Sequence, residues 1–163
     1  MRYFENPNDA NRVYGYDSQD ATQAALLQTA ISGKWKEVTG AWPPAPTLND
    51  VKIAKLADLS LACKTAIEGG FTSSALGTVN TYDSAIEDQV NLAGAAALGA
   101  ASMWRCANAQ GVKVFVQHTA AQLKQVAADG AAFKLAKLQA IDTLRGQVNS
   151  AITIAAVNAI VWV

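Results

Sequence analysis

Residues able to do acid–base or nucleophilic chemistry are few in this sequence and lie scattered along it. There is one histidine, His118, and there are two cysteines, Cys63 and Cys106. Catalysis or metal binding by a histidine needs carboxylate or cysteine partners nearby, and the sequence places none beside His118. Because His118 comes just before a predicted helix start, we expect it to have a structural or capping role.

The densest acidic cluster consists of Asp83, Glu87 and Asp88, at the first turn of a predicted helix. Negative charge is favourable there against the helix dipole, so capping explains the cluster without a metal ion. The sequence contains no glycine-rich phosphate loop, nucleophile elbow, zinc-helix motif or calcium loop. The hydroxyl-rich run 72–74 has no evident base beside it. We therefore expect that the protein is not an enzyme and has no catalytic residue, metal or cofactor.

Length and composition are those of an ordinary globular protein. Of the 163 residues, 51% are hydrophobic and 16% are charged, which is unlike a disordered tail. Thirteen basic residues balance thirteen acidic ones without a block of like charge, so no nucleic-acid partner is expected. The longest apolar stretch, 151–163, is far shorter than the ~20 residues that span a bilayer, so no membrane partner is expected.

The first residues lack the apolar run of a signal peptide, and the two cysteines lack metal-type spacing. We expect Cys63 and Cys106 to be core thiols of a protein made in the cytoplasm. A disulfide between them is the alternative that the sequence leaves open.

Residues 1–42 have the pattern of a small module. Strand-forming runs flank a cluster of turn formers at 6–9 and predict a β-hairpin. The pair 17–18 offers an N-cap for a short helix that ends at Gly33. The alternating run 35–39 then predicts a third strand, so this module should be a small sheet with one helix across it.

Six aromatic residues are concentrated in this module, which is too small to bury all of them. Aromatic side chains are enriched at protein interfaces, so we expect a docking module; the alternative is that they form its own core. The apolar C-terminus either folds back onto the main core or is buried in another subunit. The residues expected to contact a partner are Tyr3, Phe4, Tyr14, Tyr16, Trp35, Trp42, Ile160 and Trp162.

Three prolines in residues 43–47 favour an extended conformation and predict a semi-rigid linker between the module and a domain at 48–163. This domain is expected to begin with a helix that runs to about residue 68, followed by extended pieces in 71–82. A capping box at 84–87 then predicts a helix to about residue 98, and strands are expected at 103–107 and 112–117. A second capping box at 119–122 predicts a long helix, and Thr153 is expected to cap a short last helix.

The domain is predicted to have a helix-dominant α+β fold with two short antiparallel hairpins, because the connections between its strands are short. Apolar residues recur every three or four positions in the long helix and include Leu135 and Leu138; the first helix has a similar stripe that begins at Ile53. Gly130 costs the long helix about 1 kcal/mol relative to alanine, which leaves a kink or a break open at that position.

Several short stretches occur together in the second half of the chain: Gly70–Gly77 with Tyr82, Asp88–Leu92, His118–Leu123, Asp129–Gly130 and Ala159–Trp162. In this combination they resemble a domain of uncharacterised function found in tail proteins of tailed bacteriophages. The opening stretches Tyr3–Phe4, Val13–Tyr16 and Trp42–Pro44 are similar to the N-terminal part of small tail or tail-fibre-assembly proteins.

This resemblance implies a bacteriophage tail structural protein, an accessory component of the tail fibre or baseplate, that acts by protein–protein binding. The alternative is a tail-fibre assembly chaperone that is not part of the virion. The implied partner is a tail-fibre or baseplate protein, and homo-oligomerisation stays open. A structural protein of this kind would be made in the host bacterial cytoplasm and end in the virion tail. The resemblance carries over no catalytic residues.

Overall fold

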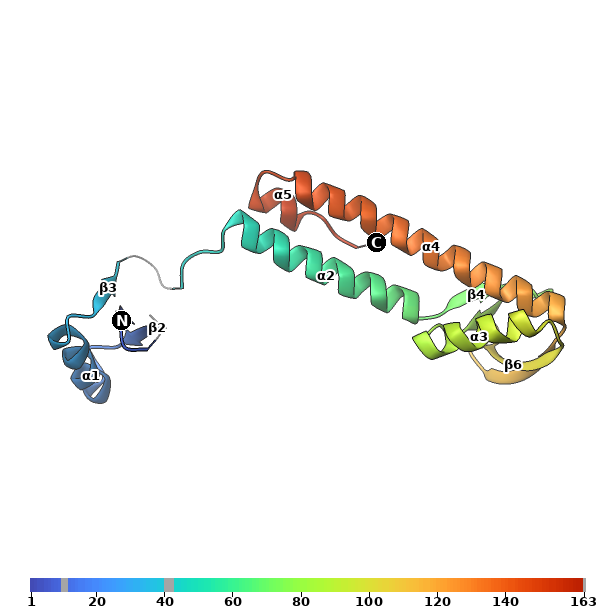
Figure 1. The fold of residues 1–163 in the computed structure, drawn as a ribbon, viewed down its shortest axis with the longest axis horizontal. Helices are drawn as coiled ribbons and strands as arrows, with labels where there is room; N and C mark the ends of the chain where they lie inside the picture. Colours follow the sequence, from blue (N-terminus) through green and yellow to red (C-terminus); the bar gives the residue numbers. More distant parts are fainter. Residues whose placement is uncertain (10–11, 40–42, 163) are drawn as a thin grey trace. The chain divides into compact units, whose positions relative to one another are not determined.

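A computed structural model describes residues 1–9, 12–39 and 43–162. The chain divides into two compact units, Met1–Thr47 (unit 1) and Leu48–Val163 (unit 2) (Figure 1). The division falls at the end of the predicted proline-rich linker. Taken together, the described elements make the helix-dominant α+β fold that the sequence predicts.

Unit 1 is a three-stranded antiparallel sheet with one helix. Its elements are β1 (Arg2–Asn6), β2 (Arg12–Tyr16), α1 (Ala21–Ser32) and β3 (Lys36–Val38), and β1 is the central strand. The predicted hairpin pairs Arg2 with Tyr16 at its open end. The N-cap of α1 is Asp20, whose carboxylate accepts the Gln23 N–H, and not the predicted pair at 17–18.

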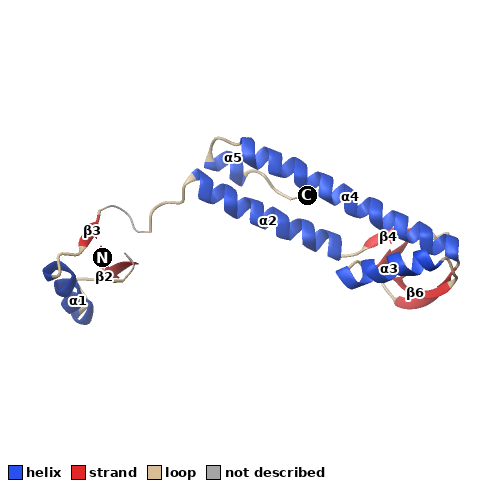
Figure 2. Cartoon of the chain, in the orientation of Figure 1, coloured by secondary structure: helices blue, strands red, loops and turns tan. Residues whose placement is uncertain are grey.

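The first part of unit 2 is a pair of long helices, α2 (Leu48–Glu68) and α4 (Ala120–Ser150), that lie side by side (Figure 2). The short helix α5 (Ile154–Asn158) packs against α2. The residues buried between these helices are Leu59, Cys63, Ile67, Ile141, Val148 and Val157.

The second part of unit 2 is a sheet with one helix, α3 (Ile86–Leu98). The strands are β4 (Phe71–Ser73), β5 (Asn80–Tyr82), β6 (Ser102–Ala107) and β7 (Lys113–His118), in that spatial order. The sequence predicts two separate hairpins, but pairing of Thr81 with Ala107 joins them into one antiparallel sheet. This sheet packs on the N-terminal half of α4 around a core of Phe71, Tyr82, Leu92, Cys106, Leu123 and Val126.

Helix α4 runs through Gly130 without interruption, so the break left open by the sequence does not occur. A Cβ atom at Gly130 would lie 2.8 Å from Cζ of Phe71. The aromatic ring of β4 therefore occupies the space that any larger residue at position 130 would need. The predicted capping box is confirmed at the start of α4, where Thr119 and Gln122 exchange backbone-to-side-chain hydrogen bonds of 2.8 and 3.2 Å.

At two other helix starts, a side-chain oxygen accepts a backbone N–H group. The Thr153 hydroxyl accepts the Ala156 N–H at 3.1 Å, which confirms the predicted cap of α5. At α3 the N-cap is Ala85, which has no capping side chain, and Asp88 accepts the Ala85 N–H at 3.2 Å. The capping box predicted from Ser84 is therefore wrong by one position. In the described part of the chain, no helix has the length and apolar content needed to cross a membrane.

Candidate functional site

His118, the last residue of β7, is completely buried. Its Nε2 atom lies 2.9 Å from the Tyr82 hydroxyl, and its Nδ1 atom lies 2.8 Å from the Val116 carbonyl oxygen. A carbonyl oxygen only accepts, so Nδ1 carries a proton, and in the neutral imidazole the Tyr82 hydroxyl then donates to Nε2. Both ring nitrogens have partners within the protein, in line with the structural role predicted for this residue.

The other buried polar groups of this region also have partners. Burial, and then the neighbouring Cys106, raise the pKa of the Tyr82 hydroxyl, while burial raises the pKa of the Cys106 thiol. A thiol with a raised pKa is a poor nucleophile at neutral pH.

The Ser73 hydroxyl donates a hydrogen bond to the Asp129 carboxylate at 2.5 Å and thereby links β4 to α4. Both Cys63 and Cys106 are free and buried, and they lie in different core clusters.

Asp83 does not cap a helix, contrary to the sequence-based interpretation. Its carboxylate lies 2.6 Å from Lys113 on β7 and 2.9 Å from Arg105 on β6. These two contacts, with the Lys113 hydrogen bond the larger, hold the pKa of Asp83 below its ordinary value of 3.8. Asp83 therefore fastens the end of β5 to the β6–β7 hairpin. Among the described residues, no three His, Cys, Asp or Glu side chains come together as a metal site would require.

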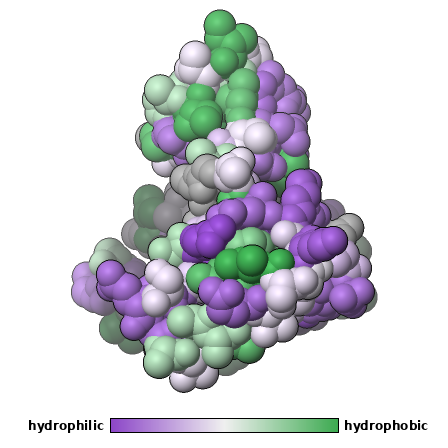
Figure 3. Space-filling view, turned by 90° about the vertical axis from the view of Figure 1, so that its left-hand side faces the viewer, coloured by the Kyte–Doolittle hydropathy of each residue, from purple (hydrophilic) through white to green (hydrophobic). Residues whose placement is uncertain are grey.

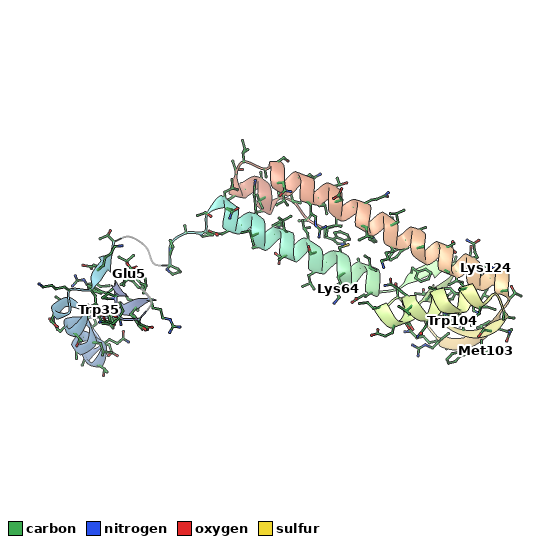
Figure 4. All side chains as sticks on the ribbon, in the orientation of Figure 1. Glu5, Trp35, Lys64, Met103, Trp104 and Lys124 are labelled. Carbon is green, nitrogen blue, oxygen red and sulfur yellow. The ribbon has the colours of Figure 1, made fainter. Side chains whose placement is uncertain are left out.

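The aromatic residues of unit 1 divide between its core and its surface. Phe4 and Tyr16 are 3% and 8% exposed and pack with α1, so they form the core of the unit, as in the alternative left open by the sequence. Tyr14 and Trp35 are half-buried against this core, with ring centroids 6.3 Å apart. Trp35 is labelled in Figure 4.

Two further partner-binding residues, Tyr3 and Trp42, were predicted in the N-terminal module. Tyr3 is half-buried and packs over Gly15, where a Cβ atom would lie 2.7 Å from its ring. Trp42 lies outside the described residues. For Tyr3, Tyr14 and Trp35, contact with a partner stays a prediction.

The C-terminal residues fold back onto unit 2. Ile160 and Trp162 are partly buried against the α2–α4 core. The Lys55 ammonium donates to the Ile160 carbonyl oxygen at 3.0 Å, and the Lys137 ammonium lies 6.0 Å from the centroid of the Trp162 ring. The structure therefore shows the first of the two arrangements that the sequence left open for this segment, and a partner contact there stays a prediction.

Sequence reasoning did not identify one open surface of unit 2, a groove of about 500 Å³ between α2, α3 and α4. We call it the α2–α4 groove. Its floor contains Cys63, Ile67 and Ile141, and Leu138 lies along it with 45% of its surface exposed. The lining residues are Ser60, Cys63, Lys64, Ile67, Glu68, Ile86, Gln89, Val90, Lys134, Leu138, Ile141 and Arg145.

Some residues assigned to buried stripes by their spacing are exposed in the structure. Leu135 and Leu138 of α4 are 55% and 45% exposed, and Ile53 of α2 is 59% exposed. A period of three to four residues cannot distinguish a side chain that faces a neighbouring helix from one that lines an open groove. The only sequence signal of an open groove was that a helix such as α4 has more apolar positions than one neighbouring helix can cover. On the face drawn in Figure 3, hydrophobic residues likewise lie exposed among hydrophilic ones.

Unit 2 is thus a helical hairpin whose one end carries a four-stranded antiparallel sheet, with buried polar pairs inside and an apolar groove outside. The family model of a domain of unknown function, DUF4376, matches residues 50–161, nearly the whole of this unit, and the chain belongs to that family. No curated protein and no solved structure matches the chain.

Proposed function

We propose that this protein is a structural component of a bacteriophage tail, in the tail fibre or baseplate, that acts by binding another tail protein. The proposal rests on the sequence resemblance to phage tail proteins. The observation of the structure that supports it best is the open apolar α2–α4 groove. In this proposal the chain transforms no molecule and needs no cofactor or metal.

A structural role agrees with the low charge of the sequence and with the number of large apolar side chains left exposed. Permanent interfaces are more hydrophobic than transient ones, because their two surfaces never need to stay apart in water. Val90 and Ile86 beside the groove are 67% and 60% exposed, and such side chains are costly to leave in water. A permanent partner would cover them.

The second candidate is a tail-fibre assembly chaperone that covers fibre surfaces during folding and then leaves. The observation that favours it is the similarity of the opening stretches to small tail or tail-fibre-assembly proteins. Both candidates bind a tail-fibre or baseplate protein, and they differ in whether the chain stays in the finished particle.

Quantitative mass spectrometry of purified, fully assembled particles separates the two. Presence of the chain in a fixed ratio to tail proteins is expected for the structural role. If the chain is absent from particles while the fibre folds only when co-expressed with it, the chaperone is the correct assignment. If fibres and particles form normally without the chain, both assignments are wrong.

A further inference from the structure

We propose that the α2–α4 groove binds an amphipathic helix of a partner protein, one that carries acidic residues along one flank of its apolar face. This inference rests on the proposed function, since it names the chemistry of the tail protein that the chain binds. It follows from the apolar lining of the groove, from the charges at its edges and from their spacing along α4.

The apolar part of the groove comes from three helices. Ile67 of α2 and Ile141 of α4 are 8% and 3% exposed and form its floor, while Ile86 and Val90 of α3 and Leu138 of α4 are 60%, 67% and 45% exposed at its sides. Ile86 and Val90 are four residues apart, so both lie on one face of α3. An apolar groove between helices is the kind of surface on which an amphipathic helix places its apolar face.

The charges around the groove are predominantly positive. Among the described residues, its lining contains three cations and a single carboxylate, Glu68, which already lies 3.9 Å from the Lys64 ammonium. The other two cations, Lys134 and Arg145, donate to uncharged groups: Lys134 to the Gln89 amide oxygen at 2.9 Å, and Arg145 to the Ser60 hydroxyl at 3.1 Å. Two positive charges therefore stand at the groove without an opposing carboxylate from its lining.

The spacing of these two cations fits a helical partner. Lys134 and Arg145 are eleven residues apart in α4, which is three helical turns and about 16 Å at a rise of 1.5 Å per residue. A helix that lies along α4 can place two carboxylates opposite them if its own acidic residues are also about eleven positions apart. Between those residues, apolar side chains every three or four positions would face Leu138 and Val90.

None of the described helices has two acidic residues eleven positions apart, which points to a partner of different sequence. Helix α1 contains no acidic residue. The acidic residues closest to the required spacing are Asp58 and Glu68 of α2, which are ten positions apart, and Glu68 itself lines the groove. A second copy of the chain is therefore a poor occupant.

The test uses the full chain and a synthetic helical peptide as probe. The peptide has an alanine-rich background, leucines alternately three and four positions apart, and two glutamates eleven positions apart; a control peptide has lysines in place of the glutamates. Affinities are measured by fluorescence anisotropy, and circular dichroism verifies that each protein variant is folded. Sedimentation velocity reports the oligomeric state of the chain alone.

Three variants separate the groove from the rest of α4 and from simple charge effects. The double variant Lys134→Gln/Arg145→Gln should weaken binding of the acidic peptide about three- to ten-fold, since each exposed ion pair contributes little. Val90→Asp should weaken it about ten-fold, because an apolar contact is lost and a like charge is added. Lys124→Gln should leave it unchanged, since Lys124 is exposed on α4 and does not line the groove (Figure 4).

The inference is overturned if the two peptides bind equally well, if the acidic peptide does not bind at concentrations up to about 1 mM, or if Lys124→Gln weakens binding as much as the double variant. It is also overturned if the chain is a dimer that Val90→Asp dissociates, because a second copy then occupies the groove. These outcomes are independent of particle composition. A chain missing from particles would refute the virion role alone, and a groove that does not bind the peptide would refute this inference alone.

Discussion

Replacing Gly130 by alanine should destabilise unit 2, although alanine is by far the better helix former. Gly130 lies in the interior of α4, where glycine costs about 1 kcal/mol relative to alanine. The new methyl group, however, would lie 2.8–3.2 Å from three atoms of the Phe71 ring. That ring is 5% exposed and stacks on Tyr82 and Phe133, with centroids 5.7 and 6.4 Å away, so it has little room to move.

The size of the effect follows from two opposing contributions. Overpacking a tight core by one methyl group costs about 1–3 kcal/mol, and the helix propensity of alanine returns about 1 kcal/mol. The expected net loss in the free energy of unfolding is about 0–2 kcal/mol. Gly146 is the matched control in the same helix, because nothing lies within 4 Å of a Cβ atom there. Gly146→Ala should therefore stabilise the protein by up to about 1 kcal/mol.

Urea denaturation of both variants measures the difference in the free energy of unfolding. Unfolding is followed by circular dichroism at about 222 nm, where α-helices have a minimum. The two substitutions should differ by about 1–3 kcal/mol even though each replaces a glycine by an alanine. Adding Phe71→Leu to Gly130→Ala should remove part of the clash and reveal a coupling free energy between the two positions. The reasoning is refuted if Gly130→Ala stabilises the protein as much as Gly146→Ala does.

Three further substitutions test other contacts. Tyr82→Phe leaves Nε2 of buried His118 without its donor and should cost about 1–3 kcal/mol in urea denaturation; an unchanged stability would contradict the assigned hydrogen bond. Asp83→Asn should cost about 0.5–1 kcal/mol at neutral pH, because its pKa is lowered chiefly by Lys113. Since the folded pKa lies below the unfolded one, this contribution is full above about pH 4 and is lost as the pH falls through the folded value, so the two proteins should converge in acid. Trp35→Ala should weaken binding of a tail partner by about 2 kcal/mol, more than it lowers the stability of unit 1; equal losses would assign the residue to the core.

Much of the local structure follows from the sequence alone. The capping box at Thr119 and the cap at Thr153 depend on side chains that reach backbone groups three residues away, and such contacts need no other part of the chain. The hairpins likewise form where turn residues separate two β-forming runs. The predictions failed where two equivalent local choices existed, as at the start of α1, where Asp20 and not the pair at 17–18 caps the helix.

The long-range features were decided only by the tertiary structure. Three contacts bring together residues that are far apart in the sequence. They are the pairing of Thr81 with Ala107, which joins the two hairpins, the packing of Phe71 on Gly130, and the ion pair of Asp83 with Lys113. The α2–α4 groove is also of this kind. Hydrophobic periodicity shows that a helix has an apolar face, but only the packed helices show which part of that face stays exposed. Local hydrogen bonds and turn geometry therefore determine where the elements lie, whereas the surface available to a partner depends on how three separate helices pack.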